Sequence, residues 1–128
     1  NIIIDYITKC DILQNRCYIA DTFSYTKPNI LNSEISSINV KGIRHPLIEK
    51  INTNEIYVAN DLNIDYLNSG YLLYGTNAVG KTSFIKSIGI SIIMAQAGLF
   101  IPANQASKVM IFDHILADIG DQQSIEQK

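Results

Sequence analysis

Residues 71–83 read YLLYGTNAVGKTS, and this stretch decides the fold class. Its first four residues form a short, continuous apolar run, which suits a strand covered on both faces of a parallel sheet. A loop with a glycine at each end follows, from Gly75 to Gly80. The chain from Gly80 to about Ala97 then reads as a helix that is apolar on most sides, as buried helices are. The stretch therefore predicts a strand, a loop and a helix in that order.

The loop fits the pattern GxxxxGK[ST] at its fixed positions, which are Gly75, Gly80, Lys81 and Thr82. Glycine permits backbone angles that side chains forbid, so successive N–H groups can turn inward around the α- and β-phosphates of a nucleotide. The helix that follows faces these phosphates with its positive dipole end. Lys81 would bring a positive charge to the β- and γ-phosphates, and the Thr82 hydroxyl would bind Mg²⁺. The loop thus predicts ATP and Mg²⁺ as ligands; the alternative is a glycine-bearing turn with a solvated lysine.

The rest of the chain alternates between helical and extended patterns, so the fold class is α/β. Pro28 forbids continuation of the first helix. The other expected elements, in chain order, are a helix over 1–22, a polar linker over 27–33, a strand within 35–43, a helical turn over 46–50 and strands over 55–59 and 109–116.

Composition narrows the possible functions. The 128 residues are enough for about one domain. The net charge is −2 without a basic stripe, so we expect another part of the protein to grip any nucleic acid. No apolar run reaches the roughly 18 residues that span a bilayer, and no basic residues precede the apolar run 2–4 as in a signal peptide. We therefore expect an intracellular fragment of a longer protein, with no membrane segment.

Five segments resemble one known family in its order and near its spacing. The loop region LYGTNAVGKTS (73–83) resembles the Walker A segment of the MutS family of DNA mismatch-repair ATPases, including the asparagine third in its loop. MAQAG (94–98) and FIPA (100–103) continue the match. RHPLIE (44–49) resembles the family's entry into its ATPase domain, and the tail ADIGDQQSIEQ (117–127) also resembles the family.

This resemblance, which covers about residues 40–128, implies a P-loop NTPase fold with an incomplete, ABC-ATPase-like sheet and a leading helix. Residues 1–33 would be a helix and linker from the preceding core or lever domain. Residues 34–128 would be the N-terminal part of the P-loop ATPase domain, truncated before the Walker B strand. Features of two branches are mixed: residues 55–61 and 74–80 resemble the branch of giant viruses and some mitochondria, whereas the tail resembles the recombination-suppressing bacterial branch.

The resemblance also assigns roles to residues. Lys81 would be catalytic and Thr82 would bind the metal, while Tyr57 stands where the family stacks an aromatic ring on adenine; packing on the core is the alternative for Tyr57. His45 is expected to order a turn or to pack under the sheet, and His114 likewise. The residues expected to bind the nucleotide are Tyr57, Gly75, Thr76, Asn77, Ala78, Val79, Gly80, Lys81, Thr82 and Ser83.

The implied function is ATP hydrolysis in an intact homodimer, coupled to binding of mismatched or branched DNA by domains outside this chain. Hydrolysis needs a Walker B carboxylate. The run 109–113 fits superficially, but the family places that strand beyond Lys128, so the isolated chain is expected to be almost inactive. Two alternatives stay open: a small-molecule kinase, which needs a lid with arginines although Arg16 and Arg44 are the only ones, and a nucleotide-binding module without hydrolysis.

Overall fold

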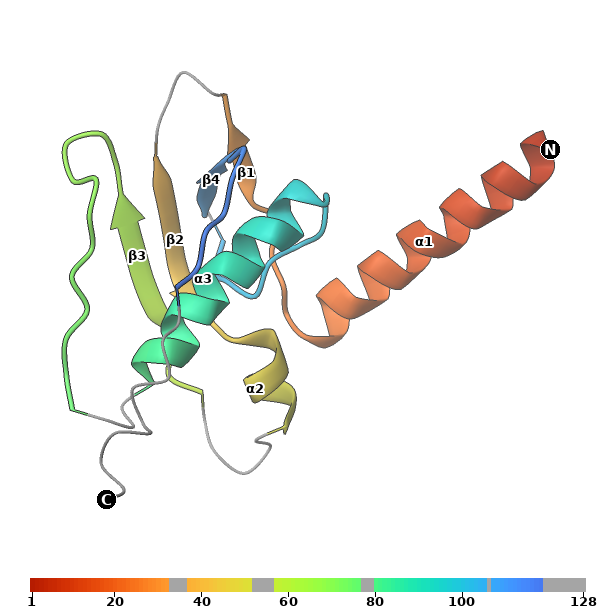
Figure 1. The fold of residues 1–128 in the computed structure, drawn as a ribbon. Helices are drawn as coiled ribbons and strands as arrows, with labels where there is room; N and C mark the ends of the chain where they lie inside the picture. The colour runs from red at the N-terminus through yellow and green to blue at the C-terminus, as the bar shows by residue number, and fades with distance from the viewer. Residues whose placement is uncertain (33–36, 52–56, 77–79, 106, 119–128) are drawn as a thin grey trace.

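The structure is a computed structural model that describes residues 1–32, 37–51, 57–76, 80–105 and 107–118. Helices and strands are mixed along the chain, as the sequence predicts (Figure 1). The polar linker predicted over 27–33 is wrong in part, because residues 29–31 pair with 108–110 and form a strand. The elements are α1 (Ile2–Thr22), β1 (Asn29–Leu31), β2 (Ile38–Ile43), α2 (Pro46–Ile51), β3 (Asn60–Ile64), α3 (Lys81–Gln96) and β4 (Lys108–Met110).

The described strands form one four-stranded sheet in the order β1-β4-β2-β3. β1 and β4 are parallel, whereas β2 is antiparallel to both β4 and β3. In the β2–β3 ladder, a register shift lies between Val40 and Ile43. Gly42 lies within this shift with a φ of 60°, and a Cβ there would come within 2.3 Å of the Asn104 side chain. The mixed α/β class is therefore confirmed, with a sheet that is mixed rather than parallel.

Helix α3 lies across one face of this sheet (Figure 1). Phe84, Ile92 and Ala95 of α3 join the same buried cluster as Val40 of β2 and Val109 of β4. The helix predicted over 80–97 is confirmed by this packing. Burial of apolar surface of this kind is the main stabilising contribution to a small domain.

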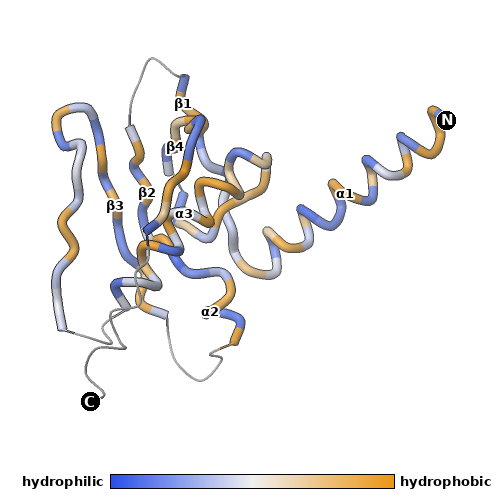
Figure 2. Tube along the Cα trace, in the orientation of Figure 1, coloured by the Kyte–Doolittle hydropathy of each residue, from blue (hydrophilic) through white to orange (hydrophobic). Residues whose placement is uncertain are grey.

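Helix α1 projects away from the sheet (Figure 1). It begins behind Asn1, whose side-chain oxygen accepts the N–H of Ile3 at 3.3 Å and caps the first turn. Apolar and polar residues alternate along its length (Figure 2), and Ala20 is its buried residue. The leading helix predicted over 1–22 is confirmed. Among the described helices, none combines the length and the apolar character that a membrane span requires.

The strand predicted for residues 71–74 is wrong. This segment runs as coil, and the side chains of Leu72 and Tyr74 are each 86% exposed. Leu73 packs against the core, and the Tyr71 ring contacts Phe84 of the same core. Apolar character by itself does not make a strand, because a strand also needs a neighbour to pair with its backbone. Among the described ladders, β3 pairs with β2 and residues 71–74 pair with nothing.

The strand predicted over 55–59 is misplaced. Residues 57–59 are coil, and 55–56 lie outside the described residues. The strand begins at Asn60 instead, because pairing with β2 buries Leu62 and lets the Asn39 amide donate to the Asn63 side chain at 3.0 Å.

The bounds of the remaining short elements agree better with the predictions from the sequence. The strand expected within 35–43 is confirmed over 38–43, and the helical turn expected from Pro46 is α2. The strand expected over 109–116 is confirmed only at its start, because β4 covers 108–110 and residues 111–116 are not in a strand.

Candidate functional site

The first turn of α3 lies at the candidate site. Gly80 precedes the helix with φ 85° and ψ 14°, and no side chain caps the turn at this position. A Cβ at Gly80 would meet no atom within 4 Å, so the left-handed backbone conformation, not crowding, favours glycine. The first N–H groups of a helix have no partner within the helix. They and the helix dipole make this end suitable for an anion.

The Lys81 side chain reaches the first two residues of the loop that precedes it. Its ammonium donates to the carbonyl oxygen of Gly75 at 2.6 Å and to that of Thr76 at 2.5 Å. These two bonds bring a positive charge to the entrance of the loop. Lys81 is itself the first residue of α3, so the charge comes from the start of the helix.

A small cleft of about 130 Å³ opens next to Lys81. Its walls come from the start of β3, from the coil 71–74 and from the first turn of α3. The Asp61 carboxylate in this wall accepts the N–H of Gly42 at 2.7 Å, which holds it in place. The lining residues are Asn60, Asp61, Tyr71, Leu73, Tyr74, Gly80, Lys81 and Phe84.

The sequence patterns did not predict that Asn60, Asp61 and Tyr71 line this cleft. Asn60 and Asp61 have low strand propensity and resemble loop residues, yet they begin β3. Tyr71 packs at 6.3 Å, ring centre to ring centre, against Phe84 of α3. The pairing of β3 with β2 and the contact of Tyr71 with Phe84 both join residues far apart in sequence, so no local signal could have identified them.

The other predicted residues are placed as follows. Thr76 and Thr82 are exposed and Ser83 is half-buried. The predicted nucleotide-binding residues Asn77, Ala78 and Val79 lie outside the described residues.

Tyr57 lies against the middle of α3. Burial raises the pKa of its phenol above 10.0, a hydrogen bond with Ser87 lowers it, and the Glu49 carboxylate raises it. Its ring is half-buried, and Tyr57 is not among the residues that line the cleft beside Lys81. The adenine-stacking role of Tyr57 stays a prediction.

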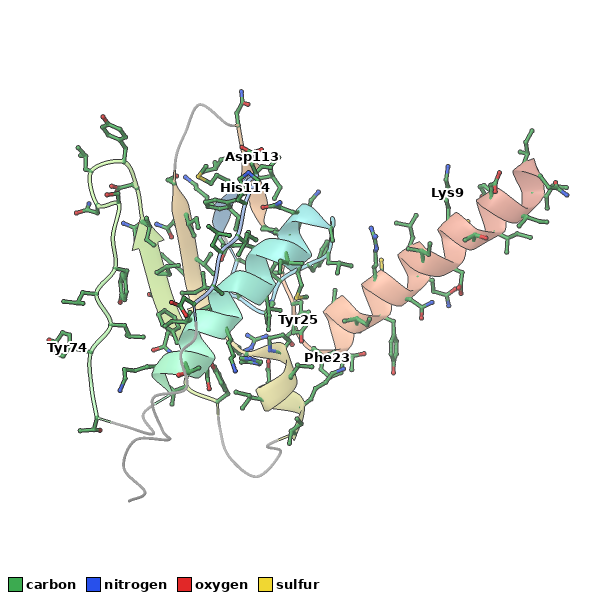
Figure 3. The ribbon with its side chains drawn as sticks, in the orientation of Figure 1. Lys9, Phe23, Tyr25, Tyr74, Asp113 and His114 are labelled. Atoms are coloured by element: carbon green, nitrogen blue, oxygen red, sulfur yellow. The ribbon has the colours of Figure 1, made fainter. Side chains whose placement is uncertain are left out.

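Asp113 and His114 lie at the opposite end of α3. The Gln96 side chain at that end donates to the Phe112 carbonyl at 3.1 Å and accepts the Phe112 N–H at 3.0 Å. Since α3 has 16 residues, its two ends are roughly 22 Å apart. Figure 3 shows Asp113 and His114 in the upper part of the molecule, away from the first turn of α3. In the described part of the chain, no group of three His, Cys, Asp or Glu residues is positioned to hold a metal.

Comparison with known proteins identifies the family of the chain. A family model described as MutS domain V matches residues 71–128. The protein called Endonuclease MutS2 from Pediococcus pentosaceus is 41% identical over 91% of this chain, and that from Lactobacillus helveticus is 39% identical over 99%. The chain belongs to the MutS family. It covers 14% and 15% of these two relatives, so it spans about one seventh of the length of the curated relatives it matches.

In this member of the MutS family, the RHPLIE segment (44–49) has a structural role. His45 is buried, and its Nδ1 accepts the N–H of Ile48 at 3.4 Å, which caps α2. Burial lowers the pKa of the His45 imidazole below 6.5, and the nearby Lys86 ammonium lowers it further. His45 thus orders a turn, as the sequence predicts. His114 does not pack under the sheet, because its side chain is exposed.

Proposed function

We propose that this MutS-family chain binds ATP and Mg²⁺ through residues 75–83, and that in a longer protein this binding serves ATP hydrolysis. One observation carries the proposal. Lys81 is the first residue of a 16-residue helix, and its ammonium donates to the carbonyl groups of Gly75 and Thr76 in the preceding loop. A positive side chain, an uncapped helix start and a left-handed glycine together suit a polyphosphate.

Each residue of the loop would have its own task. The N–H groups of Lys81, Thr82 and Ser83 lie in the first turn of α3 and would donate to phosphate oxygens. Lys81 would exchange its two carbonyl partners for phosphate oxygens, which are stronger acceptors because they are charged. The Thr82 hydroxyl is exposed and would be one ligand of Mg²⁺, which neutralises phosphate charge when bound. Asn77, Ala78 and Val79 would complete the loop, and Tyr57 would stack on adenine.

The wider role follows from the family. We propose that residues 1–33 connect to a preceding core or lever domain and that residues 34–128 are the first part of a P-loop ATPase domain. The intact protein would act as a dimer in DNA repair or recombination, with DNA held by other domains. The likeness to MutS2 proteins of Pediococcus and Lactobacillus supports a bacterial branch of the family.

Hydrolysis by this chain alone is a weaker expectation than binding. The run 109–113 ends in Asp113, yet Gln96 holds the neighbouring Phe112 at the far end of α3. Asp113 is therefore roughly a helix length from Thr82 and cannot help it to hold Mg²⁺. This observation favours nucleotide binding without rapid turnover as the second candidate function.

A kinase lid receives no support from the arginines. Arg44 is paired with Glu49. Arg16 lines a different, apolar cavity beside α1. Neither is among the residues that line the cleft beside Lys81.

Titration with a fluorescent ATP analogue and Mg²⁺ tests the proposal. Lys81→Ala should remove a charge-assisted bond worth about 1.5–3 kcal/mol and weaken binding by roughly ten- to a hundredfold. Lys86→Ala is the matched control, because Lys86 is an exposed lysine on the same helix and should leave affinity unchanged. Equal affinities of wild type and Lys81→Ala, with both chains folded, would refute the phosphate site.

A further inference from the structure

The junction between α1 and the sheet is a sharp corner at Phe23–Tyr25. Helix α1 ends at Thr22, and Ser24 then adopts a φ of 52°, a left-handed conformation that is unfavourable for a residue with a side chain. Tyr25 is buried, and its N–H returns to the Ala20 carbonyl at 2.8 Å. The corner therefore sets the direction in which α1 leaves the body (Figure 3).

Arg44 holds this corner from the other side. Its Nη2 donates to the carbonyl oxygens of Phe23 and Ser24, each at 3.1 Å. Its Nε lies 3.0 Å from one carboxylate oxygen of Glu49 and donates to the other at 3.2 Å. The Arg44 side chain is 16% exposed, so water screens these contacts less than at an open surface. We call this set of contacts the Arg44 latch: Arg44, Glu49 and the carbonyl groups of Phe23 and Ser24.

One further contact supports the corner. The Lys50 ammonium lies 4.1 Å from the centre of the Phe23 ring, a cation–π arrangement. Glu49 and Lys50 both belong to α2, so the same short helix supplies two contacts to the end of α1.

The rest of α1 has little to hold it. Of its residues only Ala20 is buried. A cavity of about 130 Å³ separates the last turns of α1 from the end of α3, so space is available beside the corner. Its lining residues are Arg16, Ile19, Ala20, Tyr25, Met94, Leu99 and Phe100.

We propose that the Arg44 latch fixes the direction of α1 and that opening it lets α1 pivot about Phe23–Tyr25. A guanidinium is suited to the task, because its rigid fork of donors can hold a carboxylate and two carbonyl groups at once. A lysine carries the same charge without the fork. The latch is independent of the nucleotide proposal, because none of its groups lies in the cleft beside Lys81.

Distance measurement between two spin labels tests the latch. The two cysteines of the chain, Cys10 and Cys17, are both exposed on α1. With Cys17→Ser, one label is placed on Cys10 and the other on Lys108→Cys, an exposed position of β4. The distance distribution should be narrow with native Arg44 and should widen roughly twofold or more with Arg44→Gln, because the corner loses both of its bonds to the guanidinium. Arg44→Lys should also widen it, since the charge alone cannot replace the fork.

Control variants separate loss of the Arg44 latch from loss of a nearby charge and from loss of folding. Lys27→Gln removes a charge from an exposed lysine near the corner and should leave the distribution narrow. Glu49→Gln keeps the carbonyl bonds and removes only the charged partner, so it should give an intermediate width. An unchanged width in a folded Arg44→Gln chain would overturn the proposal. If circular dichroism shows that Arg44→Gln does not fold, Glu49→Gln decides: a wider distribution supports the latch, and a wild-type width refutes it.

Discussion

At the scale of single residues, buried His45 makes the stability of the fold depend on pH. Its Nδ1 can accept the Ile48 N–H only while that nitrogen is unprotonated. Burial and the Lys86 charge lower the pKa of His45, so the folded chain binds a proton at this site less readily than the unfolded chain does. The contribution of neutral His45 to stability is therefore complete above pH 6.5. It is lost as the pH falls from 6.5 through the lower pKa of the folded state.

Urea unfolding as a function of pH measures this effect. The free energy of unfolding of the wild type should fall from about pH 7.5 to about pH 5. His45→Asn should flatten this dependence, because asparagine can cap α2 without titrating in that range. His114→Asn, which alters an exposed histidine, is the control and should keep the wild-type slope. If the His45→Asn slope equals that of the wild type, the slope does not originate at His45.

At the scale of elements, α3 holds different parts of the chain at its two ends. Lys81 at its start is bonded to the loop. Gln96 at its end makes two bonds to the backbone of Phe112, and together these bonds imitate a short piece of β-ladder. The segment after β4 thus keeps its place against the helix without belonging to the sheet.

Two substitutions at Gln96 should give different results. Gln96→Met removes both bonds and should lower the free energy of unfolding by about 1 kcal/mol. Gln96→Glu keeps an acceptor for the Phe112 N–H and loses the donor to its carbonyl. Hydrogen exchange at the Phe112 amide should therefore be fast in Gln96→Met and slower in Gln96→Glu. Gln14→Met, at an exposed site of α1, serves as the control. Equal exchange rates in all these chains would show that the Gln96 side chain does not protect the Phe112 amide.

Helices were easier to predict from this sequence than strands, for a physical reason. The bonds of a helix join residues four apart, so the patterns at 1–22 and 80–97 contain most of the information. A strand depends on a distant partner. Residues 71–74 are apolar enough for a strand but pair with nothing in the described ladders, whereas 60–64 become β3 because β2 pairs with them.

The residues of the candidate site also fall into a group that local sequence predicts and a group that depends on distant contacts. Gly75, Gly80 and Lys81 could be predicted as site residues because the loop pattern is local. Asp61 and Tyr71 reach the cleft through the folding of β3 and the coil that follows it. No spacing along the chain marks either of them.

At the scale of the whole molecule, the sheet with α3 forms one body, and most of α1 lies outside it. Deleting residues 1–14 should change the free energy of unfolding of that body by less than about 0.5 kcal/mol, because the deleted side chains are exposed. Deleting residues 1–24 should cost more, since it removes buried Ala20 and the carbonyl groups that Arg44 binds. Urea titrations of the two truncated chains give the comparison. A loss above about 1 kcal/mol from the shorter deletion would mean that the free end of α1 packs on the body.

The bonds at the two ends of α3 also have a mechanical consequence. An α-helix resists compression along its axis, because every turn is hydrogen-bonded to the next. An axial displacement of Lys81 would then be transmitted along α3 to Gln96, some 22 Å away. Phe112 is bonded to Gln96 through both its N–H and its carbonyl, so it would move by the same amount. Phe112 would thereby register an axial movement of Lys81 from the opposite end of the helix.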